Sequence, residues 1–253
     1  MLHHQGRHAL VTGGGTGIGL AIARMLASQG AAVTITGRRA DILDAAAAES
    51  PGLHPLVMDV ADEASVVTGT AAAIAARGPV TICVANAGIA EGKSMAKMDL
   101  AFWRQMMAIN LDGAYLTVRE CLPGMLAAGW GRTVFVSSIA GLKGLKGAPA
   151  YTASKHGMIG LMRGLSEEYL GMGLTFNALC PGYVDTDIVT RNTASIAARA
   201  GIEAEQARQM MVKTNRHKRL ITADEVAAAA NWLCGPGSDS VNGQTVEIAG
   251  GQM

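Results

Sequence analysis

The chain lacks an excess of charge of one sign, a long apolar run and any low-complexity segment. Its 253 residues include 21 Lys and Arg against 20 Asp and Glu, which gives a formal net charge of +1. No general attraction to nucleic acid or to an anionic membrane is therefore expected. No stretch is apolar enough over a sufficient length to cross a bilayer, and no signal peptide is apparent. These absences exclude nucleic-acid and membrane partners and predict a cytoplasmic protein.

Cysteine is scarce and widely spaced. The four cysteines are Cys83, Cys121, Cys180 and Cys234. This spacing fits neither a metal site nor a disulfide framework, so we predict reduced thiols in the core and no bound metal. Two adjacent histidines, His3 and His4, are interpreted as part of a frayed terminus rather than as metal ligands.

Apolar sequence is abundant: hydrophobic residues make up 49% of the chain and charged residues 16%. Short apolar runs alternate with longer Ala-rich segments. The expected strands are 8–12, 32–36, 54–58, 80–85, 132–137, 174–179 and 244–249, and the expected helices are 18–29, 40–49, 63–77, 101–128, 152–171 and 223–234. This alternation predicts an α/β fold, a parallel sheet covered by helices on both faces. We expect one domain over residues 1–253.

One segment, residues 185–218, interrupts the alternation after the sixth expected strand. It is rich in Ala, Met and Arg, and long insertions inside a compact domain are usually functional or disordered. Met210 and Met211 suggest adaptable apolar packing. We therefore predict a short helical lid over a pocket.

A glycine-rich loop joins the first expected strand to the first expected helix. The segment reads LVTGGGTGIGLAIARMLA and has five glycines within residues 13–19. Glycines let the backbone turn tightly and approach a pyrophosphate, and the N-terminus of the next helix presents free N–H groups to it. A plain turn does not explain so many glycines, so the loop predicts dinucleotide binding.

The end of the second expected strand distinguishes the two nicotinamide cofactors. In NAD-binding chains an acid about 20 residues past the glycines holds the ribose 2′-hydroxyl. Gly37 stands at that place and is followed by Arg38 and Arg39. Because a guanidinium binds a phosphate through two hydrogen bonds, we predict NADP(H) rather than NAD(H). The alternative, two solvated surface arginines, fits Arg39 better than Arg38.

Tyr151 and Lys155 are four residues apart in YTASK, so their side chains would share one helix face. A phenol with a pKa near ~10 is a poor acid or base at neutral pH. We expect a neighbouring ammonium and the positive charge of an oxidised nicotinamide to lower the pKa of Tyr151. The phenol would then donate a proton in reduction and accept one in oxidation. The alternative is a half-buried ring beside a surface lysine.

Several motifs together resemble the short-chain dehydrogenase/reductase family over essentially the whole chain. They are TGGGTGIG (12–19), DV (59–60), NAG (86–88), Asn110 in AINLDGA, VSSIAG (136–141), YTASK (151–155) and PGYVDT (181–186). The resemblance implies a Rossmann-type, doubly wound parallel sheet of seven strands. It also implies an oxidoreductase acting on CH–OH groups, with a general similarity to ketoacyl reductases and 3-hydroxyacyl dehydrogenases.

The resemblance also implies a cofactor-binding set. Its members are Gly13, Thr16, Gly17, Ile18, Gly19, Arg38, Arg39, Asp59, Val60, Asn86, Ala87, Gly88, Tyr151, Lys155, Pro181, Gly182, Val184 and Thr186. Asp59 would lie beside the adenine, and Thr186 or the Val184 backbone would hold the carboxamide. Two structural alternatives stay open: Asp59 would instead cap the next helix, and Thr186 would instead cap the lid.

The family's catalytic tetrad maps onto Asn110, Ser138, Tyr151 and Lys155. By this resemblance Ser138 would hydrogen-bond the substrate oxygen, and Asn110 would help hold a water that connects Lys155 to solvent. Neighbouring strand residues point to opposite faces, so only one of Ser137 and Ser138 can face the site. The family spacing selects Ser138.

The substrate is the least determined feature. We expect residues 90–96, 139–148 and Tyr183 with the lid to line its pocket. Cationic side chains nearby are Lys143, Lys146, Arg191, Arg199 and Arg208. They favour a surface that docks an anionic substrate, such as a carboxylate or a thioester of coenzyme A or of an acyl carrier, no more strongly than they indicate an ordinary solvated surface. Arg219 is expected to support the fold after the lid.

The expected reaction therefore interconverts a ketone and a secondary alcohol, on a 3-oxoacyl or other small carbonyl compound. The alternatives are an NAD-dependent dehydrogenase of the same fold and a non-enzymatic NADP(H)-binding sensor or scaffold.

Small residues recur at helical spacing after Tyr151: Ala153, Gly157, Gly160 and Gly164. They indicate either close packing on the sheet or a helix contact between subunits. The resemblance favours the second and a homotetramer.

Overall fold

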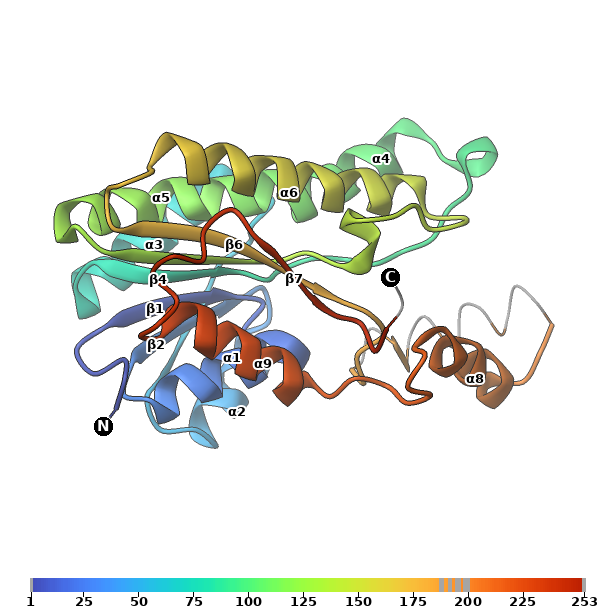
Figure 1. Ribbon diagram of the computed structural model, residues 1–253, viewed down its shortest axis with the longest axis horizontal. Coiled ribbons are helices and arrows are strands. Elements are labelled where there is room, and N and C mark those ends of the chain that lie inside the picture. The colour runs from blue at the N-terminus through green and yellow to red at the C-terminus, as the bar shows by residue number, and fades with distance from the viewer. Residues whose placement is uncertain (1, 187–188, 191–192, 194–196, 198–200, 252–253) are drawn as a thin grey trace.

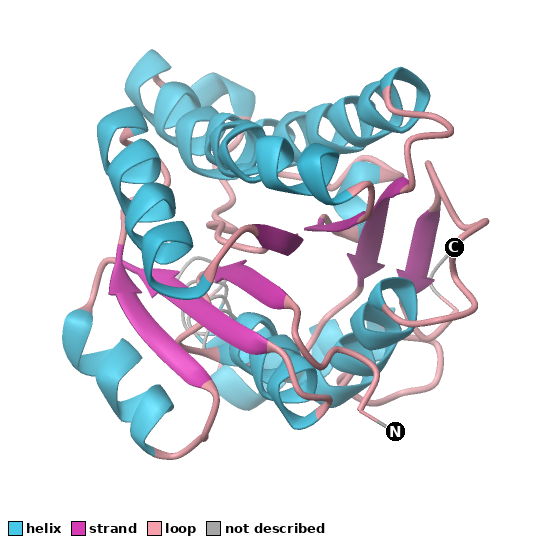
Figure 2. Cartoon of the chain, turned by 90° about the vertical axis from the view of Figure 1, so that its left-hand side faces the viewer, coloured by secondary structure: helices cyan, strands magenta, loops and turns pink. Residues whose placement is uncertain are grey.

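Seven parallel strands form one sheet, and helices cover both of its faces (Figure 1, Figure 2). The structure, a computed structural model, describes residues 2–186, 189–190, 193, 197 and 201–251. The strands are β1 (His8–Thr12), β2 (Ala32–Gly37), β3 (Leu53–Val57), β4 (Val80–Ala85), β5 (Gly131–Val136), β6 (Leu174–Pro181) and β7 (Thr245–Ile248). Their order is β3-β2-β1-β4-β5-β6-β7. The predicted doubly wound, Rossmann-type sheet of seven strands is confirmed.

Two helical layers sandwich the sheet. The helices are α1 (Gly17–Ser28), α2 (Ala40–Ala48), α3 (Glu63–Arg77), α4 (Leu100–Met107), α5 (Gly113–Ala128), α6 (Pro149–Glu168), α8 (Ala204–Thr214) and α9 (Ala223–Cys234). In Figure 1, α3, α5 and α6 lie above the sheet, and α1, α2 and α9 lie below it. Neighbouring strand residues serve opposite layers: Leu10 packs with the α5–α6 side and Val11 with the α1–α9 side. This alternation explains the continuous apolar runs of the strands.

The helix expected over 101–128 is interrupted. It consists of α4, a π-helical turn η2 (Ala108–Asp112), and α5. Such turns are rare and frequently occur at functional sites. Apolar spacing does not reveal the change of hydrogen-bond pattern, so the sequence did not predict it. The turn contains Asn110, whose side chain is completely buried.

The insertion after β6 contains a helix, as predicted. α8 projects beyond the rest of the molecule, at the end of the sheet where β6 and β7 finish (Figure 1). Met211 is buried with Val189 and Leu220, whereas Met210 is exposed. Arg191 and Arg199 lie outside the described residues.

The frayed terminus predicted for His4 is wrong. His4 is 1% exposed, its Nε2 lies 3.0 Å from Asn231 Oδ1, and its backbone N–H donates to Gln29 O. The N-terminal segment is thereby fixed to α9 and to the end of α1. The described residues contain no group of three or more His, Cys, Asp or Glu that could hold a metal ion. All four cysteines are buried free thiols.

Within the described residues, no helix combines the length and the apolar character that crossing a membrane requires.

A buried histidine couples the fold to pH. His8 is 3% exposed; its Nδ1–H donates to Gly78 O (2.8 Å), and its Nε2 accepts from the Thr34 hydroxyl (2.9 Å). Burial lowers the pKa of His8 below 6.5, the hydrogen bond to Gly78 partly opposes this, and the charge of Arg77 adds to it. The folded protein therefore favours neutral His8.

We expect the free energy of unfolding to fall as the pH drops from 6.5 toward the lower pKa of folded His8. In that window the unfolded chain binds a proton that the folded chain does not, whereas above it both states are neutral at His8. One such group contributes a slope of at most about 1.4 kcal/mol per pH unit. Urea unfolding between neutral and mildly acidic pH measures the slope, and His8→Gln should reduce it. Parallel pH curves for wild type and variant would refute the assignment.

Candidate active site

Three adjoining cavities lie where β1, β4, β5 and β6 end. The glycine-loop cavity, of about 200 Å³, is lined by Gly13, Thr16, Gly17, Ile18, Gly19, Asn86, Ala87, Gly88, Ile89, Ala90, Val136, Ser137, Tyr151, Lys155 and Thr186. It shares Tyr151 and Thr186 with a second cavity and Gly13 and Gly88 with a third. The carboxyl ends of parallel strands, beside the reversal of strand order at β1 and β4, are where such sheets bind ligands.

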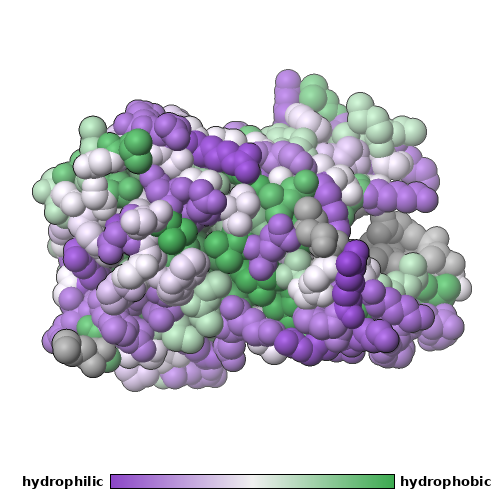
Figure 3. Space-filling model, in the orientation of Figure 1, coloured by the Kyte–Doolittle hydropathy of each residue, from purple (hydrophilic) through white to green (hydrophobic). Residues whose placement is uncertain are grey.

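The second cavity, which we call the serine–tyrosine cavity, has a volume of about 440 Å³. Its lining includes Ser138, Tyr151, Pro181, Gly182, Tyr183, Val184 and Thr186. The third, the arginine cavity, has about 420 Å³ and is lined in part by Gly37, Arg38, Arg39, Asp59 and Val60. Every predicted cofactor-binding residue thus lines at least one of the three cavities. In the space-filling view the molecule is hollowed between the part that carries α4 and the part that carries α8 (Figure 3).

Glycine is required in the loop between β1 and α1 for two physical reasons. Gly13 and Gly17 have φ values of 63° and 54°, in the left-handed region that favours glycine. A Cβ at Gly19 would lie 2.4 Å from both Asn86 Nδ2 and Gly13 O. Asn86 in turn donates to Thr12 O at 2.8 Å, which ties the loop to the end of β4. The loop is a narrow backbone cradle at the N-terminus of α1, the kind of site that a pyrophosphate fits.

The arginine cavity has no acid at the end of β2. Gly37 occupies that place, and the exposed side chains of Arg38 and Arg39 follow it. Among the described residues, neither guanidinium has an ion-pair partner. The Asp59 carboxylate accepts from Ala61 N–H, while α3 is capped by the carboxylate of Asp62. Asp59 is therefore not the cap of α3, and that structural alternative is wrong.

Helix α6 places Tyr151 and Lys155 beside the end of β5. Pro149 begins the helix, so both side chains come from its first two turns. The Lys155 ammonium donates to Val136 O at 2.8 Å, and its Nζ lies 5.9 Å from the centroid of the Tyr151 ring. The Ser138 side chain hydrogen-bonds Tyr151 and also accepts from Ala140 N–H.

The surroundings of Tyr151 and Lys155 in the protein shift the pKa values of both side chains. Burial raises the pKa of Tyr151, and the hydrogen bond with Ser138 partly opposes the rise. Burial lowers the pKa of Lys155 to about 8. The sequence predicts that Lys155 lowers the pKa of Tyr151, and for the protein alone this direction is wrong. The reason is that the ammonium is desolvated and directed at the Val136 carbonyl rather than at the phenol.

The neighbouring serine has a different set of contacts. Ser137 is 4% exposed and donates from its Oγ to Lys155 O at 3.3 Å, so its hydroxyl helps to fix α6 against the end of β5. Ser138 is the serine that reaches Tyr151.

Asn110 lies behind the cavities rather than in their lining. Its Oδ1 accepts from Ile89 N–H at 2.8 Å, and its Nδ2 donates to Ile89 O at 2.9 Å and Ser154 Oγ at 3.1 Å. A Cβ at Gly88 would lie 3.1 Å from Asn110 Oδ1 and 3.6 Å from Lys155 Nζ. Asn110 and Lys155 therefore approach the same glycine, and Asn110 holds the chain that follows β4.

The segment after β6 turns back over the site. Val184 forms a parallel bridge with Ile221, and the Thr186 hydroxyl donates to Val184 O at 3.3 Å. A capping role for Thr186 involves residues 187–188, which lie outside the described residues. Arg219 forms two 2.7 Å contacts with the carboxylate of Glu225, in agreement with the predicted structural role.

Sequence reasoning missed contacts that involve the backbone or small helix residues. Val136 holds Lys155 through its carbonyl, which no side-chain pattern can indicate. Ile89 contacts Asn110 through both backbone groups. Ser154 was detectable, since it is a small polar residue within YTASK and one turn from Tyr151, whose carbonyl it bonds.

Comparison with known proteins agrees with this geometry. A family model described as short chain dehydrogenase matches residues 7–197. The chain is 34% identical over 253 residues to a D-beta-hydroxybutyrate dehydrogenase of Rhizobium meliloti, covering 96% of this chain and 97% of the relative. It is 35% identical over 249 residues to a putative ketoacyl reductase of the granaticin polyketide synthase of Streptomyces violaceoruber, covering 96% and 92%.

Solved structures of related enzymes resemble this chain over nearly its whole length. A crystal structure of an actinorhodin polyketide ketoreductase variant with NADPH superposes with a TM-score of 0.94 at 31% identity, covering 97% of each chain. The crystal structure of levodione reductase superposes with a TM-score of 0.92 at 32% identity, covering 98% of each chain.

Proposed function

Because the chain belongs to the short-chain dehydrogenase family, an oxidoreductase family that acts on hydroxyl and keto groups and binds NAD(P), we propose that it interconverts a ketone and a secondary alcohol with NADP(H). The observation that carries the proposal is the convergence of Ser138, Tyr151 and Lys155 where the glycine-loop cavity meets the serine–tyrosine cavity. A substrate oxygen in the serine–tyrosine cavity would lie beside the hydroxyls of Ser138 and Tyr151. The carbon bonded to that oxygen would face the glycine-loop cavity.

The proposed proton donor in reduction is Tyr151. Its raised pKa keeps the phenol protonated at neutral pH, so it holds the proton that an alkoxide needs. Ser138 would donate a hydrogen bond to the same oxygen and fix its position. When bound, the nicotinamide supplies or accepts the hydride. In oxidation Tyr151 can accept the proton of the alcohol only as a phenolate, so the phenol must first pass its own proton to a base. Lys155, with a pKa of about 8, is the nearby amine that could accept this proton once its ammonium has released one to solvent.

Asn110 is proposed to act through position. It fixes residue 89 and approaches Gly88 together with Lys155. The water-mediated link between Lys155 and solvent is consistent with this arrangement and is part of the proposal.

The cofactor proposed is NADP(H), with NAD(H) as the alternative. The absence of an acid at Gly37 supports it, and so does the Arg38 guanidinium beside the arginine cavity, which has no ion-pair partner among the residues that the structure describes. The relative solved with NADPH supports the same choice.

A small, largely apolar carbonyl compound is the substrate proposed, which includes 3-oxoacyl compounds. The cationic Lys146 lines the serine–tyrosine cavity, but the acidic Glu91 lines it as well. Arg208 Nη2 lies 3.9 Å from Asp185 Oδ2, so the carboxylate already neutralises part of the charge of the Arg208 guanidinium. An anionic or thioester substrate is thus supported by Lys146 and opposed by Glu91.

We propose a homotetramer as the assembly. Gly160 and Gly164 have open space where a Cβ would lie, whereas a Cβ at Gly157 would meet Leu111 at 2.9 Å. Tyr115 on α5 is 45% exposed on the same side of the sheet. Apolar side chains also gather along the face crossed by the edge strand β7 (Figure 3). Light scattering should give four times the chain mass of 26.0 kDa; the mass of a single chain would contradict this.

The proposed reaction is tested by the absorbance of the reduced nicotinamide. The wild type is mixed with NADPH or NADH and with a panel of ketones, oxo esters and oxo thioesters, and in the other direction with the oxidised cofactors and secondary alcohols. We expect turnover of at least one ketone, faster with NADPH. Cofactor binding without turnover of any member would contradict the proposal.

A further inference from the structure

The serine–tyrosine cavity contains a second phenol, Tyr183, which the proposed reaction does not use. It follows Pro181 and Gly182 at the end of β6 and lines the cavity together with Tyr151. Burial is the largest cause of the raised pKa of Tyr151, and the Tyr183 phenol is a smaller one. The two phenols therefore face the same space.

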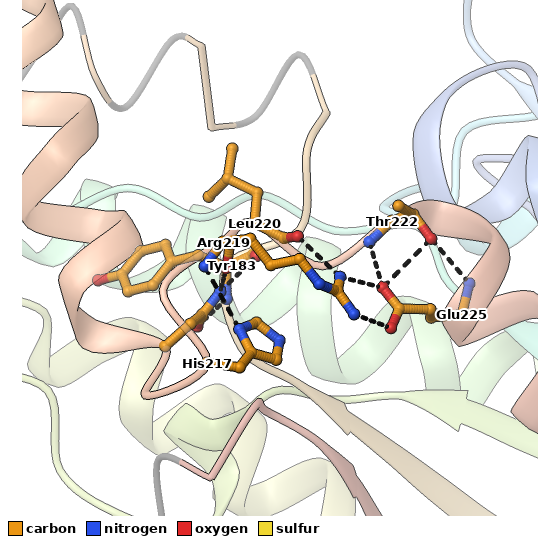
Figure 4. Close-up of polar contacts among 7 residues, drawn as sticks. Tyr183, His217, Arg219, Leu220, Thr222 and Glu225 are labelled. Atoms are coloured by element: carbon orange, nitrogen blue, oxygen red, sulfur yellow. Dashed lines mark hydrogen bonds and ion pairs between the residues drawn. The ribbon is translucent and has the colours of Figure 1, made fainter.

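The main chain of Tyr183 is held from both sides. Its N–H donates to Asn215 Oδ1 at 3.4 Å, and its carbonyl accepts from Asn215 Nδ2 at 3.1 Å. Asn215 is completely buried and also donates to Arg219 O at 2.8 Å. Figure 4 shows the ring of Tyr183 extending away from this polar network, so its hydroxyl is not part of the network. The ring packs against Val189 and Met211.

The Tyr183 hydroxyl has no hydrogen-bond partner in the described part of the chain, and burial alone raises its pKa. The wall has more apolar than polar residues, and its polar side chains, such as Ser138, Glu91 and Lys146, form no hydrogen bond with the Tyr183 hydroxyl in the described part of the chain. The apolar residues include Ile139, Leu145, Ala148, Val189 and Met211. Ligand cavities of this kind orient their ligands through a few placed polar groups. A substrate atom is the natural partner for a neutral O–H donor fixed in such a place.

We propose that Tyr183 is a specificity residue that donates a hydrogen bond to a second oxygen of the substrate, so that the preferred substrates are ketones with an apolar body and a second carbonyl, ester or hydroxyl oxygen. This inference rests on the proposed function and narrows its substrate class. Ser138 and Tyr151 would hold the oxygen that reacts, and Tyr183 the oxygen that does not. A simple ketone would leave the Tyr183 hydroxyl unpaired, which costs binding energy in the transition state.

The test uses substrate pairs that differ by one oxygen: an oxo ester with the alkanone of equal length, and a cyclic diketone with the matching monoketone. The values of kcat/KM are measured for wild type, Tyr183→Phe and the control Tyr169→Phe. The first change removes one oxygen and leaves the backbone bonds to Asn215. The control makes the same change at the far end of α6, at a residue that does not line the cavity. Comparing the within-pair ratio of the wild type with that of each variant cancels the difference in intrinsic reactivity between the two ketones.

We expect the wild type to prefer the two-oxygen member of at least one pair. Tyr183→Phe should reduce that preference by about tenfold or more, mainly through the two-oxygen substrate, while the affinity for NADPH stays the same. Tyr169→Phe should keep the wild-type preference. An unchanged preference in Tyr183→Phe, or an equal loss for both members of each pair, would overturn the inference and leave the proposed function intact. No turnover of any member by wild type would contradict both.

Discussion

Replacing Tyr151 by Phe is expected to lower the turnover of ketones by about a hundredfold to ten-thousandfold, the range that a positioned acid or base contributes. The variant keeps the ring against Lys155 and loses the hydroxyl that bonds Ser138. The affinity for NADPH should change little, because the glycine cradle and Arg38 are untouched. Stopped-flow absorbance of the reduced nicotinamide measures turnover, and fluorescence titration measures binding.

Tyr169→Phe is the matched control for this prediction too, because the Tyr169 ring packs tilted against Phe176 and lines neither the glycine-loop nor the serine–tyrosine cavity. Its turnover should match the wild type. Near-normal turnover in Tyr151→Phe would remove Tyr151 as the acid, whereas a parallel loss of turnover and NADPH affinity would indicate a role in binding only.

The second large effect is expected at the arginine cavity. Arg38→Ala should raise the Kd of NADPH by about ten- to a hundredfold, since hydrogen bonds between charged groups contribute about 1.5–3 kcal/mol. The Kd of NADH should stay within about twofold, because NADH lacks the 2′-phosphate that the guanidinium would bind. Titration of each reduced cofactor measures both constants.

Arg39→Ala provides the comparison at the adjacent residue, which begins α2 as its N-cap. A smaller loss of NADPH affinity is expected there. If wild type binds NADH more tightly than NADPH, and Arg38→Ala changes neither constant, the choice of NADP(H) is wrong.

Much of the fold follows from local sequence because strands and helices here have distinct apolar patterns. The runs at β1 and β4 are buried throughout, as expected for strands covered on both faces. The interruption by η2 was not predictable in this way, because a π-helical turn alters hydrogen bonding without altering the apolar spacing around Asn110. The burial of His4 depends on Asn231, which is 227 residues away in the sequence.

In the candidate active site, too, the sequence predicts some features and not others. Motifs placed Ser138, Tyr151 and Lys155, and these residues do lie together. Their pKa shifts could not be inferred from spacing, because they depend on desolvation and on a carbonyl partner. The Lys155 Nζ lies 5.9 Å from the centroid of the Tyr151 ring and donates a hydrogen bond to Val136 O. The four-residue spacing therefore predicted a stronger electrostatic interaction between Lys155 and Tyr151 than the structure has.

The most direct measurement of the central claim follows the hydride itself. Wild-type protein is incubated with a ketone from the panel and with NADPH that carries deuterium at the transferable position of the nicotinamide. The account predicts that the alcohol product gains one deuterium at its carbinol carbon, and that the unreacted ketone gains none. Alcohol formed without the label would show that the hydrogen does not come from the nicotinamide, and would contradict the account.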